Sequence, residues 1–351
     1  MLRGTRTRLG RTLPYLYGAL IIIGLLLIDW AGYDSLLPDP APYRYELVAE
    51  GKGSSFSDLT FPVPSGTHIK KFETRLDEGG GVIAEFFLAY MGSEIAPILL
   101  DWQNFSADLS LVIPTRTDDL ADLARAVDEH AQEGAIILGW WDTARQLSVL
   151  DGVNSLYDQN FNRPLFLPVA WRGDEDAIES LERIFWRIIG EGEGDFGLVV
   201  DALASPPQVG IPVLHELAGE RSAFLVVQVS DLYKLSLLRP GLMPVKYQDF
   251  HNSGDIHESI LTVKKWLEER QLSHYIVEKM GLTSKRMYYI NDSESVVDLP
   301  LLARLLPMGE FDPFSMEGLK LVANYGSYWV YELISKGEKV KSEEEALTER
   351  D

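Results

Sequence analysis

Cysteine is absent from this chain of 351 residues. The protein therefore has no disulfide framework, no thiol nucleophile, no cysteine-ligated iron–sulfur cluster and no c-type haem, which needs Cys-x-x-Cys-His. We expect no cofactor, and we do not expect a conventional electron carrier. About three hundred residues can bury a sizeable core without disulfides.

Recognisable catalytic motifs are missing as well. The sequence has no nucleophile elbow, no Walker loop, no dinucleotide glycine fingerprint and no His-Glu-x-x-His. The glycines of Gly190–Gly194 alternate with glutamates, which would repel a phosphate, so a flexible connection between a helix and a strand is the better interpretation. These absences favour a protein that is not an enzyme.

Basic residues are few, and four of them stand at the N-terminus. Arg3, Arg6, Arg8 and Arg11 precede an uncharged apolar stretch, Leu13–Ile28. A helix over Leu13–Ala31 would approach the roughly 30 Å of a bilayer core. The arginines would keep the N-terminus in the cytoplasm, so that the remainder is translocated. A cleaved signal peptide is the alternative. The bulky Ile28–Tyr33 suits a cleavage site poorly and favours an uncleaved anchor.

The expected organisation follows from this start. Residues 1–12 form a cytoplasmic basic segment, 13–31 the transmembrane anchor, 32–43 a Pro-rich spacer, 44–335 the translocated domain and 336–351 a charged tail. The formal net charge is −21, and without the four leading arginines 28 basic residues face 53 acidic ones. Such a domain repels nucleic acid and suits a basic partner or a cationic ligand, although acidity also serves solubility alone.

The fold class comes from the hydrophobic pattern of the domain. Short apolar runs alternate with amphipathic stretches, which is typical of α/β proteins with a mainly parallel, three-layer arrangement. The expected strands are Ser110–Ile113, Ala135–Trp140, Phe196–Val200, Ala223–Val229 and Met287–Ile290. The expected helices are Asp118–Gln132, Asp174–Ile189 and Asp255–Arg270.

Two further segments refine this plan. The turn-rich 44–109 has Gly79–Gly81 between two strand-like stretches, which predicts a hairpin or a small β-rich lobe before the α/β core of 110–335. Ser327–Leu333 alternates as a strand does, and we expect it to close a sheet edge.

The most distinctive motif is Trp140-Trp141-Asp142, at the end of an expected strand and just before a helix. Ligands bind at that end of strands in open α/β sheets. We therefore predict a recognition cleft with two aromatic walls and a carboxylate, because adjacent tryptophans are not expected to face one core. The cleft would include Thr143 and Arg145. The alternative is an Asp142 or Thr143 helix cap beside two packing tryptophans.

Two weaker candidates lie further along the chain. Asp201 follows the expected strand Phe196–Val200 and would line the same cleft edge. His251 and His257 stand within a run that also holds carboxylates, which is compatible with a metal site. Helix capping by Ser253 or Asp255 explains that run equally well, and we predict no metal.

Several of these features together resemble the HaoB family, whose members are encoded beside hydroxylamine oxidoreductase in ammonia oxidisers and some methanotrophs. They are the N-terminal anchor, the strand end Leu138–Asp142 with Arg145-Gln146, the helix start Gly254–His257 with Val263–Leu267, and Tyr328–Tyr331. The resemblance implies a bacterial inner-membrane protein with a periplasmic domain. Its partner would be hydroxylamine oxidoreductase or a c-type cytochrome, and no catalytic residue is carried over.

Trp140-Trp141-Asp142 is also similar to a motif of the oligosaccharyltransferase catalytic subunit, where it recognises the acceptor hydroxyl amino acid. That resemblance implies a ligand- or peptide-binding module within the α/β portion. The first hypothesis is an accessory protein that tethers or positions a periplasmic partner near the quinone pool, and the second is this binding module.

Overall fold

A computed structural model describes thirteen stretches of the chain, apart from the side chains of 169–170, 172 and 256–259. They are residues 23–24, 40–76, 79–92, 95–106, 117–150, 153–160, 169–188, 193–243, 245–251, 256–280, 284–290, 299–308 and 316–334. The expected strand Ser110–Ile113 and the tail of 336–351 lie outside these stretches, as does the expected span Leu13–Ala31 apart from Ile23 and Gly24. Within them, no helix has the length and apolar character to cross a membrane.

The first sheet is a four-stranded antiparallel meander in the order β1-β2-β3-β4. Its strands are β1 (Tyr43–Lys52), β2 (His68–Leu76), β3 (Val82–Tyr90) and β4 (Ile98–Asn104). The predicted hairpin around Gly79–Gly81 is present, because β2 and β3 pair antiparallel on either side of these glycines. A short 3-10 turn, η2 (Gly53–Ser55), follows β1.

Strand β3 of this sheet is packed on both faces, and its successive side chains point to opposite faces. Phe86 packs with Trp186 of the segment that follows helix α4 (Glu175–Phe185), which covers one face. The neighbouring Phe87 belongs to the main core on the other face. The nearly continuous apolar run of β3 reflects this double burial.

The second sheet has five strands in the order β11-β12-β7-β5-β6. Its strands are β5 (Ile136–Gly139), β6 (Asn154–Ser155), β7 (Ala223–Gln228), β11 (Leu319–Tyr325) and β12 (Tyr328–Leu333). β5 runs parallel to β6 and β7, whereas β12 runs antiparallel to both β7 and β11.

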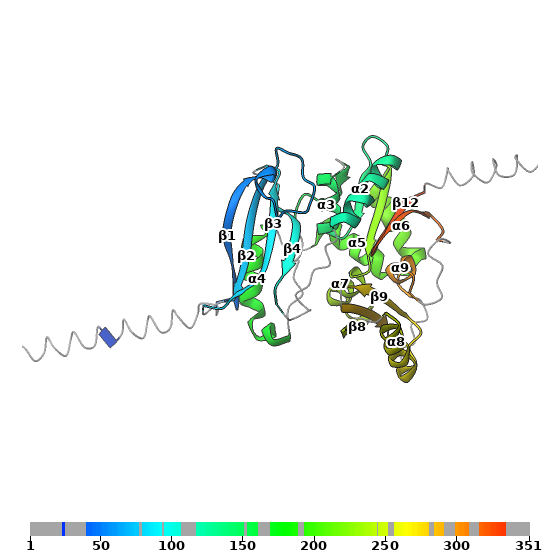
Figure 1. The fold of residues 1–351 in the computed structure, drawn as a ribbon. Helices are drawn as coiled ribbons and strands as arrows, with labels where there is room; N and C mark the ends of the chain where they lie inside the picture. The colour runs from blue at the N-terminus through cyan, green and yellow to red at the C-terminus, as the bar shows by residue number, and fades with distance from the viewer. Residues whose placement is uncertain are drawn as a thin grey trace, which may run out of the picture.

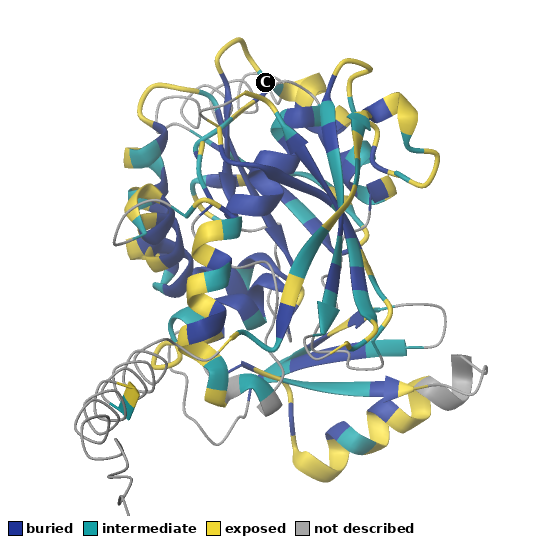
Figure 2. Cartoon of the chain, turned by 90° about the vertical axis from the view of Figure 1, so that its left-hand side faces the viewer, coloured by how far each residue is buried: buried dark blue, intermediate teal, exposed yellow. Residues whose placement is uncertain are grey.

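A third, three-stranded antiparallel sheet carries helix α8 (Ile256–Arg270). Its order is β8-β10-β9, with β8 (Val245–His251), β9 (Tyr275–Lys279) and β10 (Ser284–Ile290). Phe250 and Met287 pack against Val263 and Leu267 of α8. The opposite helix face is largely exposed at the lower edge of the molecule (Figure 2).

The remaining helices pack on and between the sheets (Figure 1). They are α2 (Thr117–His130), α3 (Trp141–Leu150), η4 (Val169–Asp174), α5 (Gly194–Ala204), α6 (Pro207–Ala218), α7 (Asp231–Leu238) and α9 (Leu301–Leu305). Helix α3 contacts both β4 and β5, so it joins the first sheet to the second. Helix α7 leads from β7 to β8 and joins the second sheet to the third.

The expected mainly parallel fold is wrong, because antiparallel pairing dominates all described sheets except at β5. The apolar run Phe196–Val200 is not a strand but part of α5. The exposed side of this helix carries Leu198, an apolar residue within the run, so the run lacks the amphipathic period that would have revealed a helix. The strand predicted at Ser327–Leu333 is confirmed as β12, but it lies between β11 and β7 and closes no edge.

Candidate functional site

The end of β5 turns sharply into α3 at the motif predicted to be functional. Gly139 has a φ of 146°, which L side chains rarely adopt. A Cβ at this position would stand 2.1 Å from the carbonyl oxygen of Val226 in the adjacent strand. The glycine therefore lets β5 and β7 stay close while the chain turns, and α3 begins two residues later at Trp141.

Both tryptophans of the motif are buried in the same core. Trp140 is 4% exposed and Trp141 1% exposed. The Trp140 ring packs edge-on against Phe196 of α5, with centroids 5.2 Å apart. The expectation that adjacent tryptophans would not share one core is wrong, because the strand ends at Gly139 and the chain changes direction before the second ring. The rings do not form walls of an open cleft.

Asp142 belongs to a buried cluster of charges with Asp231 and Lys234. The Lys234 Nζ donates to Asp231 Oδ1 at 2.9 Å and lies 3.8 Å from Asp142 Oδ2. It also stands 5.2 Å from the Trp140 ring centroid, in a cation–π contact. The three side chains are each less than a tenth exposed. This ion cluster therefore connects the end of β5 with the start of α7.

Electrostatics keep the lysine of this cluster charged. Burial alone would lower the pKa of the Lys234 ammonium, but the carboxylates of Asp142 and Asp231 outweigh it and raise that pKa above its ordinary value. Glu278 of β9 adds to the same effect from the third sheet. Its carboxylate also accepts a hydrogen bond from the Tyr288 hydroxyl at 3.2 Å. The charge of Lys234 therefore depends on residues of the second sheet's connections and of the third sheet.

This cluster occupies the place where ligands bind in open α/β sheets, at the carboxyl ends of the parallel strands β5 and β7. The sequence-based prediction found Asp142 but missed Asp231 and Lys234. The signal was available, because Asp231 stands two residues after the strand Ala223–Val229 and Lys234 is one helical turn later.

Thr143 and Arg145 have structural partners within the fold. The Asp142 carboxylate accepts from the Thr143 backbone N–H at 2.6 Å and from its hydroxyl at 3.3 Å. Arg145, only 1% exposed, donates to the carbonyl oxygens of Ala96 and Pro97 and to the side-chain oxygen of Asn160. Burial lowers the pKa of the Arg145 guanidinium to about 10. Arg145 therefore ties the loop before β4 to helix α3.

Asp201 does not follow a strand, because it lies within α5 on an exposed surface. Its Oδ1 accepts from the Nε of Arg239 at 2.7 Å, and Glu193 also pairs with that guanidinium. Asp201 therefore serves a surface ion pair, and its predicted role at a cleft edge is not supported by any described contact with Asp142.

His251 and His257 are not brought together by any described contact. His251 is the last residue of β8 and is exposed, whereas the side chain of His257 and all of 252–255 lie outside the described residues. Asp249 of the same run is engaged elsewhere, since its carboxylate pairs with the buried Arg286 at 2.8 Å. In the described part of the chain, no group of three or more His, Asp or Glu residues is placed to hold a metal ion.

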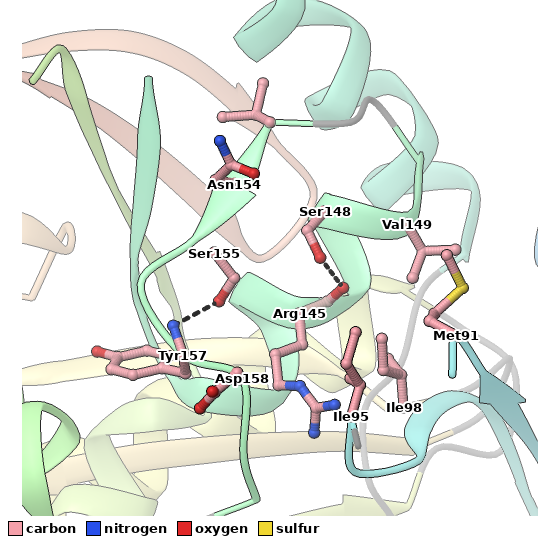
Figure 3. A pocket seen from close by; sticks show the side chains of 11 residues that line it. Met91, Ile95, Ile98, Arg145, Ser148, Val149, Asn154, Ser155, Tyr157 and Asp158 are labelled. Carbon is pink, nitrogen blue, oxygen red and sulfur yellow. Dashed lines mark hydrogen bonds between the residues drawn. The ribbon is translucent and has the colours of Figure 1, made fainter. Parts of the chain in front are cut away.

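An open pocket lies beside α3, on the opposite end of that helix from the ion cluster. It measures about 210 Å³, and its walls come from the β3–β4 connection, α3, β6 and the residues after β6 (Figure 3). Arg145 is the one predicted site residue that lines it. The sequence does not predict this pocket, because Met91, Ile95 and Ile98 lie about fifty residues before the other lining residues, which fall within 145–158.

The fold and the site together define a mixed α/β protein in which an internal ion cluster fills the strand-end position. The chain belongs to the family described as HaoA-associated protein HaoB, whose model matches residues 10–333. Family membership assigns it an accessory role associated with hydroxylamine oxidoreductase (HaoA), in hydroxylamine oxidation and nitrification.

Other comparisons add little. No curated protein matches the chain. A crystal structure of the C. jejuni pglb C-terminal domain is similar with a TM-score of 0.35 and 10% sequence identity, covering 61% of this chain and 99% of that one. At that score the similarity supports no conclusion about this protein.

Proposed function

We propose that this protein is a non-enzymatic accessory protein that holds or positions hydroxylamine oxidoreductase, or the c-type cytochrome that accepts its electrons. It would do so on the periplasmic side, close to the quinone pool. Family membership is the observation that carries the proposal, because the family is described by its association with HaoA. The absence of cysteine agrees with a role outside electron transfer itself.

Two properties of the chain support a positioning role. The strand-end position that would bind a ligand in an open α/β sheet is filled by Asp142, Asp231 and Lys234, whose ammonium pairs with both carboxylates. The net charge of −21 gives the protein a long-range field that accelerates encounter with a basic partner. Recognition would then rest on the outer surface and depend on salt.

The test is capture of the oxidoreductase by the tagged, full-length chain from detergent-solubilised membranes and periplasm. At about 20 mM salt we expect a multihaem protein, seen by its haem absorbance, to elute with the tagged chain. At about 500 mM salt we expect most of it to be lost, because the screening length falls several-fold. An unrelated tagged protein of similar negative charge is the matched control.

Failure to capture any multihaem protein at low salt would contradict the proposal, as would equal capture by the acidic control. The location is tested separately by adding protease to intact spheroplasts. Digestion of the described domain supports a periplasmic position, whereas protection until the cells are lysed contradicts it. A further assay adds the purified chain to hydroxylamine without the oxidoreductase, and we expect no oxidation.

A further inference from the structure

The first sheet carries a group of cations at one end of the face that α4 covers. Lys52, His68 and Tyr90 are register partners across β1, β2 and β3. Glu50 and Lys70 form the next pair on the same face. Contacts agree with this arrangement, because Lys70 Nζ stands 5.1 Å from the centroid of the Tyr90 ring and the His68 ring lies edge-on to that ring at 6.0 Å.

Arg187 adds a further cation to this group from the end of α4. Burial raises the pKa of the Tyr90 hydroxyl and the charge of Arg187 opposes that rise, so the field of the guanidinium reaches Tyr90. The neighbouring Trp186 and Ile188 pack in the aromatic core on the same face of the sheet. We call Lys52, His68, Lys70 and Arg187 the basic patch.

The backbone of Arg187 is in the left-handed region, with a φ of 53°. The residue follows the end of α4, and the Ile188 N–H donates to the carbonyl oxygen of Arg183 at 3.1 Å, which is the pattern of a Schellman helix end. Glycine is the usual residue at this position because it has no Cβ. An arginine there is strained, and strain of this kind points to a use for the side chain.

One carboxylate serves two of the cations of the basic patch. His68 Nε2 lies 2.9 Å from Glu50 Oε1, and Lys70 Nζ lies 3.3 Å from Glu50 Oε2. The Lys70 ammonium, and after it His68, lowers the pKa of the Glu50 carboxyl. Lys52 is exposed and forms no ion pair with any residue that the structure describes. The basic patch therefore keeps an excess of positive charge on a protein whose net charge is −21.

Cations that gather from two neighbouring strands and a helix end suit an anion with several oxygen atoms. A phosphomonoester has its second pKa at about 6, so at neutral pH it carries nearly two negative charges on three acceptor oxygens. We propose that the basic patch binds a phosphate-type dianion, either free or as part of a lipid headgroup. Lys52 and Lys70 would hold its oxygens from the sheet, and Arg187 from the end of α4. This site goes beyond the proposed accessory function and does not depend on it.

The first arm of the test follows the phosphorus NMR line width of methyl phosphate, a dianion, as the full-length chain is added. Dimethyl phosphate has a single negative charge and is the control probe. We expect methyl phosphate to bind at least about threefold more tightly, the size of one partly exposed charge interaction.

The second arm distinguishes the two sources of the dianion. The full-length chain is sedimented with phosphatidylcholine vesicles that contain or lack phosphatidic acid, whose headgroup is a phosphomonoester. Extra sedimentation with phosphatidic acid identifies a lipid headgroup as the ligand. Binding of methyl phosphate without that extra sedimentation identifies a free phosphate compound.

Two variants separate this site from a general effect of charge. Arg187→Gly places the preferred residue at the helix end, so the melting temperature should be no lower than that of the wild type, while binding should weaken at least about threefold. Lys52→Gln removes an exposed cation and should weaken binding to a similar extent; it decides alone if Arg187→Gly melts earlier. Lys264→Gln removes an exposed lysine of α8, changes the net charge equally and is the matched control. We expect it to leave binding unchanged.

Three results would overturn the proposal. The first is that neither methyl phosphate at about 10 mM nor phosphatidic acid is bound. The second is equal binding of methyl phosphate and dimethyl phosphate, and the third is an equal effect of Lys52→Gln and Lys264→Gln. Each of these is independent of whether the chain captures hydroxylamine oxidoreductase.

Discussion

Lys234→Met tests the buried ion cluster at the ends of β5 and β7. The substitution nearly keeps the length of the side chain and removes the cation that pairs with the Asp142 and Asp231 carboxylates. Removing one partner of a buried ion pair leaves an uncompensated charge and costs about 3–5 kcal/mol. We therefore expect the free energy of unfolding at pH 7 to fall by about that amount.

The loss should depend on pH in a defined direction. Burial raises the pKa of the Asp231 carboxyl, and without Lys234 this pKa rises further. A carboxyl whose folded-state pKa lies above its unfolded value favours folding in acid, and that contribution is lost as the pH rises through the folded-state pKa. The difference between wild type and variant should therefore be largest at pH 7 and shrink toward pH 4.

The assay is urea unfolding at pH 4, 5, 6 and 7, followed by tryptophan fluorescence. Lys264→Met, which removes an exposed lysine of α8, is the matched control and should change stability by less than about 0.5 kcal/mol. A loss below about 1 kcal/mol at pH 7, or a loss of equal size at pH 4 and pH 7, would refute the reasoning.

Three further variants test other parts of the structure. Gly139→Ala should cost about 3 kcal/mol in urea unfolding, because its methyl group would collide with the adjacent strand and its φ is unfavourable for alanine; a loss below about 1 kcal/mol would show that the turn relaxes. Tyr45→Phe removes a 2.6 Å hydrogen bond to the buried Glu182 carboxylate and should lower the free energy of unfolding, followed by thermal melting, by about 1.5–3 kcal/mol. An unchanged melting temperature would contradict that hydrogen bond. Asp201→Asn should lower the free energy of unfolding in urea by no more than about 1 kcal/mol, because its pair with Arg239 is exposed. A larger decrease would contradict the assignment of Asp201 to a surface ion pair.

The sequence predicted those elements whose local pattern is complete within one segment. The helix at Asp118–Gln132 has one apolar stripe and the strand at Ala223–Val229 is short and uniformly apolar, and both are present. The strand predicted at Phe196–Val200 was wrong because the exposed side of α5 carries the apolar Leu198, and a short apolar run does not distinguish a helix from a strand. The prediction of a mainly parallel sheet was wrong for a different reason, because the direction of pairing depends on where the distant β12 inserts.

The candidate site was also predicted only where its pattern lies within one segment of the chain. Asp142 was found because a polar residue after a buried strand is visible locally, whereas its partner Lys234 lies 92 residues later in the chain and only folding joins them. The pocket residues Arg145 and Asp158 are closer in sequence, but Met91, Ile95 and Ile98, which complete the pocket, come from the β3–β4 connection and the start of β4. Such a pocket has no continuous motif.

The position of β12 has a consequence for how the protein is made. Tyr328 pairs with Gln228, one hundred residues earlier, and every residue of β7 is buried. Until β12 has left the ribosome, β7 presents an open apolar edge, which is prone to pair with other chains. The second sheet is therefore completed only once β12 has been synthesised, and a chain that ends before Ser327 should aggregate rather than fold.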